Sequence, residues 1–175
     1  MGSPLSLNAL CEDLQVSHQT VARWTDMLER VYGIFRIAPF GAPRLRAVKT
    51  ERKHYHSDWP VVQEPGARFE DLVAGHLLKW AEYQADAQGR EVELRYFRDI
   101  DRREVDFVLL HRGGAPIAFV ECKLGDEAVA PGLRYLKARF SEVIAWQVSA
   151  FGQRDFISPE GVRVAPAVRL LKELV

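Results

Sequence analysis

The sequence predicts an α/β protein in which a winged helix-turn-helix module precedes an αβββαβ domain with a central mixed sheet. Two observations lead to this prediction. Residues 5–31 show two helical apolar patterns with a short break between them, and residues 92–124 show three strand-like apolar runs after a long amphipathic helix. Because the stretch 59–66 contains two prolines and a glycine, we expect it to connect separate modules at residues 5–58 and 66–175.

The first module begins with two short helices and continues into a hairpin. Ser17 precedes the second helix and is a natural N-cap. Two apolar runs, residues 34–38 and 45–48, flank the Gly41-Ala42-Pro43 break and predict the two strands of a wing. Each helix is expected to bury one apolar face: Leu7, Leu10, Cys11 and Leu14 in the first, and Val21, Trp24, Leu28 and Val31 in the second.

The second module begins with a long helix, because apolar residues recur at helical spacing from Phe69 until Gly89 ends the pattern. Strand-like runs then follow one another, and the second and third are joined by a Gly-Gly turn that predicts a hairpin. The predicted strands are 92–98, 104–110, 116–124, 143–148 and 162–164, and the predicted helices after the first are 133–140 and 167–174.

Composition excludes several classes of protein. The chain has 24 basic and 24 acidic residues, so net charge gives no argument for nucleic acid and only local patches can. Its two cysteines, Cys11 and Cys122, lie far apart in apolar segments, which argues against a disulfide framework or a cysteine metal site. No apolar run is long enough for a membrane span and no secretory leader is visible, so we expect a cytoplasmic protein without membrane contact.

Three charged residues stand where apolar residues are expected. Glu121 and Lys123 interrupt the apolar strand 117–124 and, by strand periodicity, lie on one of its faces. Asp106 stands directly before another apolar run, and the predicted hairpin lets it approach Glu121. Two close carboxylates repel each other unless a cation lies between them, and hard oxygen ligands suit Mg²⁺ or Mn²⁺. The alternative is a simple pair at a strand end beside a turn residue.

Together these residues resemble a known signature. Glu70 on a helix, Asp106 in Glu-Val-Asp-Phe, and Glu121-Cys122-Lys123 look like the PD-(D/E)xK pattern of the restriction-endonuclease-like fold. The resemblance implies that Glu70, Asp106, Glu121 and Lys123 are catalytic. It also implies that Asp106 and Glu121 hold the metal ion, and that Lys123 orients the attacking water. From the residues alone, Glu70 is equally well explained as an acid in the first turn of a helix.

A wider set of motifs resembles the C-terminal region of prokaryotic AAA-type ATPases. These motifs are Ser17-x-x-Thr20-Val21, Lys53-x-Tyr55 with Asp58, Gly66-x-x-x-Glu70, Tyr96-Phe97-Arg98-Asp99 and Glu104-Val105-Asp106-Phe107. The resemblance implies an ATPase domain as a partner. The sequence has no Gly-x-x-x-x-Gly-Lys-[Ser/Thr] motif, so we expect that domain earlier in a longer chain or in a separate one.

The helix-turn-helix and wing contain the one local basic patch, formed by Arg36, Arg44, Arg46, Lys49, Arg52 and Lys53. A recognition helix presents its first residues to the major groove, and basic wing residues contact phosphates. We therefore expect DNA as a partner. The same face could instead be solvated or dock the ATPase domain. The candidate DNA-binding residues are His18, Gln19, Thr20, Arg23, Arg44 and Arg46.

Three functions follow from these features. The first is a Mg²⁺-dependent nuclease or nuclease-like enzyme that acts on DNA. The second is a non-catalytic DNA-binding or regulatory module, in which the second domain is a scaffold. The third is an interaction module that couples an ATPase to a partner. The substrate form, the sequence preference and self-association into a homo-oligomer stay open at this point.

Overall fold

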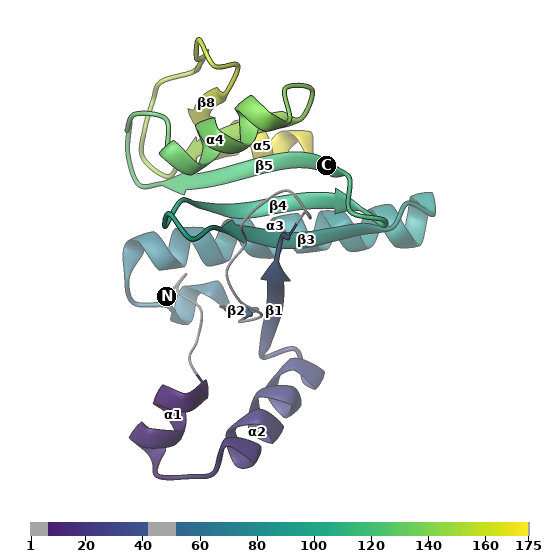
Figure 1. The fold of residues 1–175 in the computed structure, drawn as a ribbon, viewed down its shortest axis with the longest axis vertical. Coiled ribbons are helices and arrows are strands. Elements are labelled where there is room, and N and C mark those ends of the chain that lie inside the picture. The colour runs from purple at the N-terminus through teal and green to yellow at the C-terminus, as the bar shows by residue number, and fades with distance from the viewer. Residues whose placement is uncertain (1–6, 42–51, 175) are drawn as a thin grey trace.

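The computed structural model of the chain describes residues 7–41 and 52–174, which form an α/β fold around one eight-stranded mixed sheet (Figure 1). The strands lie in the order β2-β1-β3-β4-β5-β6-β8-β7. The strand bounds are Ile34–Pro39 for β1, Lys53–His56 for β2, Val92–Arg98 for β3, Glu104–His111 for β4, Pro116–Lys123 for β5, Ile144–Ser149 for β6, Phe156–Ile157 for β7 and Arg163–Pro166 for β8. The α/β class is therefore as predicted.

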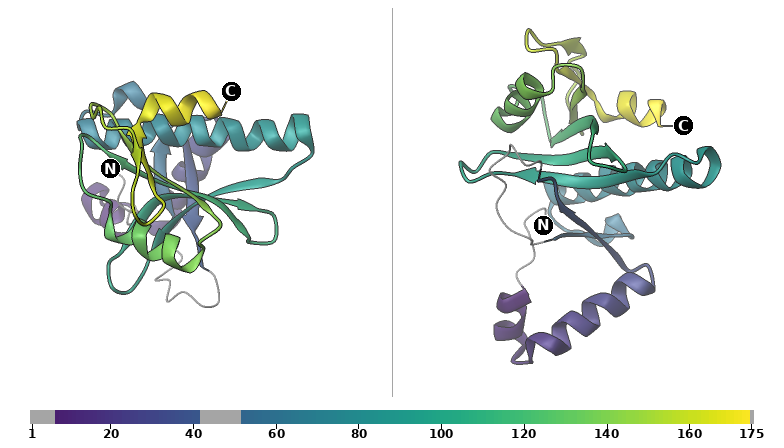
Figure 2. Two further views of the ribbon diagram at one scale, coloured as in Figure 1. Left: turned by 90° about the horizontal axis from the view of Figure 1, so that it is seen from above. Right: turned by 45° about the vertical axis from the view of Figure 1, so that its right-hand side comes forward.

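Helices cover both faces of the sheet (Figure 2). The long helix α3 (Pro65–Gln88) and the last helix α5 (Ala167–Glu173) bury Val73, Leu77 and Leu170 in the core on one face. Helix α4 (Pro131–Arg139) buries Leu133 and Leu136 in a second core on the other face. The middle parts of β4 and β5 are thus buried on both faces, and a polar residue there must find its partners inside the protein.

Helix α3 begins and ends where local chemistry dictates. The Glu64 carboxylate accepts hydrogen bonds from the backbone amides of Gly66 and Ala67, and Pro65 occupies the first helical position. The helix ends at Gly89, which has a φ of 63°, a conformation that glycine adopts without strain. The fixed start places Glu70 and the neighbouring Asp71 in the second turn of the helix, facing β2.

The N-terminal helices project away from the sheet (Figure 1). Helix α1 spans Leu7–Leu14 and helix α2 spans His18–Arg30, with Ser17 accepting a hydrogen bond from the Thr20 amide as predicted. The predicted buried face of α2 is wrong in large part. Val21 and Thr25 are buried where α2 lies against α1 and β1, but Trp24, Leu28 and Val31 are exposed.

The hairpin after α2 is part of the central sheet. β1 pairs antiparallel with β2, with Ile37 opposite Lys53, and its other edge pairs parallel with β3, with Ala38 opposite Arg95. The predicted second wing strand, residues 45–48, lies outside the described residues, and β2 was not predicted. The central sheet therefore contains strands from both predicted modules, residues 5–58 and 66–175.

Among the described residues, none of the helices combines the length and the apolar character that a membrane crossing needs.

The close approach of α4 to the strand that holds Asp106 gives a first prediction. A methyl group at Gly132 would lie 2.0 Å from the backbone oxygen of Glu104, so Gly132→Ala must push α4 off β4. We expect the free energy of unfolding in urea to fall by about 1–3 kcal/mol. Gly75→Ala is the control, because the space around Gly75 on α3 is open, and it should raise stability by up to about 1 kcal/mol. A Gly132→Ala variant as stable as the parent would contradict this packing.

Candidate functional site

Asp106 and Glu121 face each other across the β4–β5 pair. The regular register of this pair ends with Phe107 opposite Val120, and Asp106 and Glu121 are the residues directly beyond it on the two strands. At this position, backbone amides donate hydrogen bonds to the two side-chain carboxylates. The Cys122 amide donates to Asp106 Oδ2 at 2.9 Å, and the Asp106 amide donates to Glu121 Oε2 at 3.3 Å. Each carboxylate is thus fixed by a backbone amide at a defined place in the sheet.

Two residues of β2 enter the same cluster. Lys53 and Tyr55 alternate along β2 with the half-buried His54 and His56, and they are 1% and 0% exposed. Lys53 Nζ lies 3.4 Å from Glu70 Oε1 and 3.6 Å from Asp106 Oδ1. The Tyr55 hydroxyl donates to Glu70 Oε1 at 2.6 Å. The N-terminal segment therefore supplies both a cation and a hydrogen-bond donor to the acidic residues of the second region.

Lys123 forms the solvent-facing end of the cluster. Its Nζ donates to Glu121 Oε1 at 2.9 Å, and its side chain is 26% exposed. Lys53 is enclosed, so the two ammonium groups occupy different environments at the two ends of one network. An external anion can approach Lys123 from solvent, whereas Lys53 serves the carboxylates around it.

Burial and mutual charge shape the protonation of the cluster. Burial raises the pKa of Asp106 well above its usual range, and the negative charges of Glu70 and Glu121 raise it further, against the opposite effect of Lys53. Burial also raises the pKa of Glu121, because it outweighs the nearby Lys123 ammonium. For Lys53, burial would lower the pKa, but the charges of Glu70 and Asp106 lead the effects that raise it above the usual value.

The charges of the cluster do not balance. Three carboxylates, from Glu70, Asp106 and Glu121, meet two ammonium groups, from Lys53 and Lys123, when all five are ionised. One negative charge is left in a largely buried place, which is the condition that raises the carboxylate pKa values. A bound cation or a bound proton relieves it.

The donors of this cluster fit a hydrated magnesium or manganese ion. Among the residues that the structure describes, no three His, Cys, Asp or Glu side chains are gathered as a ready metal-binding group. Asp106 and Glu121 nevertheless offer two hard carboxylates beside the exposed end of the cluster, and each oxygen keeps a second lone pair. Mg²⁺ typically keeps several waters and binds through one or two carboxylates, so two protein ligands suffice.

The four residues predicted as catalytic, Glu70, Asp106, Glu121 and Lys123, thus belong to one connected network. Sequence reasoning missed Lys53 and Tyr55 as members and named Lys53-x-Tyr55 only as a motif of the wider resemblance, because Lys-His-Tyr-His has no alternation of apolar and polar residues that would indicate a buried face. The prediction that Lys53 belongs to an exposed basic patch is wrong, because its ammonium is enclosed by the carboxylates.

The other residues of the predicted DNA-binding surface differ in their exposure and contacts. Arg36 also leaves the patch, because its guanidinium pairs with Asp26 and Glu29 on α2. Arg44 and Arg46 lie outside the described residues. At the start of α2, His18, Gln19 and Arg23 are exposed, whereas Thr20 is half-buried and bonds to Ser17.

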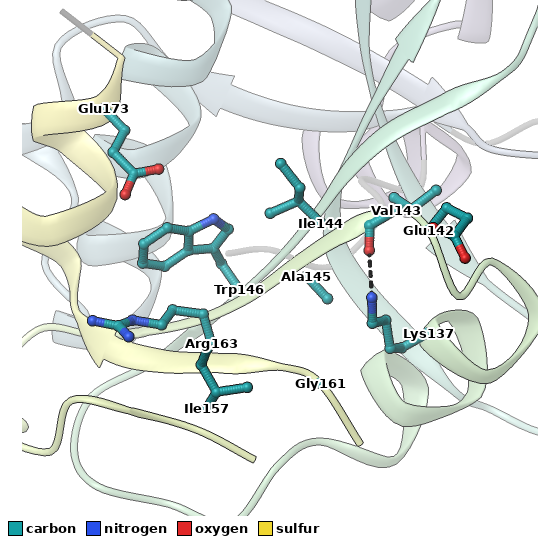
Figure 3. Close-up of a pocket in the computed structure, with 10 residues that line it drawn as sticks. All are labelled: Lys137, Glu142, Val143, Ile144, Ala145, Trp146, Ile157, Gly161, Arg163 and Glu173. Atoms are coloured by element: carbon teal, nitrogen blue, oxygen red, sulfur yellow. Dashed lines mark hydrogen bonds between the residues drawn. The ribbon is translucent and has the colours of Figure 1, made fainter. Parts of the chain in front are cut away.

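A cavity of about 480 Å³ lies apart from this cluster, between β6, β8 and the ends of α4 and α5 (Figure 3). Its two cationic groups are already engaged. Lys137 donates to the carbonyl oxygen of Val143, and Arg163 pairs with Asp155. The cavity brings no carboxylate pair or uncommitted cation together, so the Asp106 cluster is the better candidate for chemistry.

The Tyr55 hydroxyl tests whether β2 holds the cluster in place. Tyr55→Phe removes the 2.6 Å hydrogen bond to Glu70 and leaves a half-buried carboxylate without that donor. We expect the free energy of unfolding to fall by about 1.5–3 kcal/mol, the range for hydrogen bonds to charged groups. Tyr83→Phe, on an exposed tyrosine of α3, should change it by less than about 0.5 kcal/mol. Equal effects of the two substitutions would show that the bond to Glu70 contributes nothing.

Comparison with known proteins gives two matches to family descriptions. Residues 1–62 match a domain of unknown function described as DUF8612, and residues 65–167 match a domain of unknown function described as DUF4143. Neither the curated proteins nor the solved structures contain a match. The two matched segments meet within three residues of each other, before α3, and both contribute side chains to the cluster. The second match covers more than half of the 175 residues of the chain, so the chain belongs to the DUF4143 family.

Proposed function

We propose that the protein is a Mg²⁺-dependent nuclease that hydrolyses phosphodiester bonds in DNA. The observation that supports this most is the cross-strand pair of Asp106 and Glu121, held by backbone amides, with the partly exposed Lys123 beside it. The pair has an unbalanced negative charge that a divalent cation would neutralise. The resemblance to the PD-(D/E)xK signature and the restriction-endonuclease-like fold, within the C-terminal region of AAA-type ATPases, adds support.

Each residue of the cluster has a role in this proposal. Asp106 and Glu121 hold the cation, which when bound supplies a Lewis acid that polarises the phosphate. Lys123, the more exposed of the two lysines, orients the attacking water and steadies the charge that develops on the phosphate oxygens. Glu70, which bonds to Tyr55 and Lys53, keeps the inner end of the network in place.

The N-terminal helices suit the binding of a macromolecule. His18, Gln19 and Arg23 at the exposed start of α2 are the proposed DNA contacts, together with Thr20 and with Arg44 and Arg46. The resemblance adds an ATPase domain, in the same or a separate chain, as a further proposed partner.

A second candidate function is a non-catalytic interaction module. The observation that favours it is the exposed apolar stripe of α2, formed by Trp24, Met27, Leu28 and Val31. These residues follow the helical spacing of a surface that packs against another helix or a groove. In this function the acidic cluster only stabilises the fold, so metal binding and cleavage separate the two candidates.

The metal prediction tests the proposed function. In the metal-free protein, the raised pKa values of Asp106 and Glu121 mean that their favourable contribution is present at low pH and is lost as the pH rises through those values. Mn²⁺ competes with the protons for these oxygens, so its stabilising effect should grow with pH. At a concentration 100-fold above the Kd, Mn²⁺ should stabilise the fold by about 2.7 kcal/mol, measured as a rise in Tm.

Variants assign the effect to residues. Asp106→Asn and Glu121→Gln should lose the Mn²⁺-dependent rise in Tm and the cleavage of duplex or single-stranded DNA, whereas Asp86→Asn, at an exposed acid of α3, should keep both. Lys123→Ala should bind Mn²⁺ but cleave nothing. A parent protein that shows neither the rise in Tm nor cleavage would favour the interaction module instead.

A further inference from the structure

The Lys53 ammonium lies where a cation bridging two carboxylates would lie. Its Nζ is 3.4 Å from Glu70 Oε1 and 3.6 Å from Asp106 Oδ1. The strand that holds Lys53 is fixed, because β2 pairs with β1 and the His56 amide donates to Asp71 on α3 at 3.0 Å. The ammonium is therefore a built part of the cluster, anchored at both ends of a short strand.

The surroundings of Lys53 restrict its ammonium to contacts inside the cluster. Its side chain is 1% exposed, so it cannot reach a DNA phosphate in solvent. An ammonium has three N–H donors, and besides the two carboxylates the Lys53 ammonium faces the ring of Tyr96, whose centroid is 5.4 Å away. Carboxylates and a ring face surround the charge, which is the environment of a structural counter-ion.

Asp106 is shared between two sides. Its Oδ1 faces Lys53, and its Oδ2 accepts the Cys122 amide on the strand that holds Glu121. Glu70 and Glu121 thus lie toward opposite ends of the network around Asp106. A divalent cation between Glu70 and Asp106 would have to share their oxygens with the ammonium, and the two positive charges would repel each other. On the Glu121 side the ammonium is that of Lys123, which bonds to Glu121 Oε1 at 2.9 Å but is 26% exposed, so a long flexible side chain can turn it toward solvent when a cation binds.

We propose that Lys53 takes the place of a second cation between Glu70 and Asp106, so that the site accepts a single divalent cation on the Glu121 side of Asp106. This inference rests on the proposed metal-dependent function. Lys53 acts through the two carboxylates and is a positioning residue. The segment matched at residues 1–62 thereby determines how many metal ions the site of the DUF4143 segment holds.

The test counts bound Mn²⁺ by equilibrium titration and by electron paramagnetic resonance, which distinguishes an isolated Mn²⁺ from a coupled pair. The parent should bind one Mn²⁺ per chain and show an isolated signal. Lys53→Ala removes the ammonium and opens its space, and it should bind two and show a coupled signal. Lys53→Arg restores a cation and should return to one. Lys123→Ala, the matched control at the other lysine, should stay at one.

Two further variants assign the sides of the site. Glu70→Gln should leave the single Mn²⁺ of the parent in place, whereas Glu121→Gln should lose it. Lys53→Ala with Glu70→Gln should return from two to one, because the second ion then lacks a carboxylate.

The outcomes separate the inference from the function on which it rests. A parent that binds no Mn²⁺ overturns the proposed function and the inference with it. A parent that binds two overturns the inference alone, and this holds even if Lys53→Ala does not fold. A folded Lys53→Ala variant that still binds one ion also overturns it.

Discussion

The Asp106 carboxylate, buried between two strands and facing a helix and a distant edge strand, is the contact around which the site is built. It accepts a hydrogen bond from the Cys122 amide of β5 and faces the Lys53 ammonium of β2. The negative charge of Glu70 on α3 raises its pKa. A buried charge is costly unless it is paired and hydrogen-bonded. The buried Asp106 carboxylate therefore needs the partners that β5 and β2 supply, and the buried Lys53 ammonium needs the carboxylates of Asp106 and Glu70. This shared requirement makes the N-terminal strands part of the same structural unit as the family domain.

Lys53 changes the electrostatic argument for a metal ion. From the sequence, two neighbouring carboxylates with Lys123 alone predict a divalent cation for neutrality. In the folded chain Glu70 adds a third carboxylate, and the enclosed Lys53 ammonium offsets it, so the residual charge stays at one negative unit. The cluster can then exist without metal at the cost of raised carboxylate pKa values. The cation is therefore proposed as a functional ligand of the exposed end, and the stability of the fold does not depend on it alone.

Periodicity predicted the parts of the fold that are long and local. Helix α3 and strands β3, β4 and β5 follow apolar patterns that continue over seven residues or more, and the β4–β5 hairpin brings Asp106 to Glu121 as expected. The parallel pairing of β1 with β3 joins residues more than fifty positions apart, and no local pattern reports such a contact. Strand β2 has four residues, two of them histidines, so its buried Lys53 looks like part of a basic surface until the sheet is known.

In the proposed site, Asp106 and Glu121 bind one divalent cation at the exposed end of a network whose inner cation is Lys53. The most direct measurement is a crystal structure of the full chain soaked in Mn²⁺, with an anomalous difference map calculated at the manganese edge. This arrangement predicts one peak in contact with the carboxylates of Asp106 and Glu121, and none between Glu70 and Asp106. A peak between Glu70 and Asp106, or no peak in the cluster at all, would contradict it.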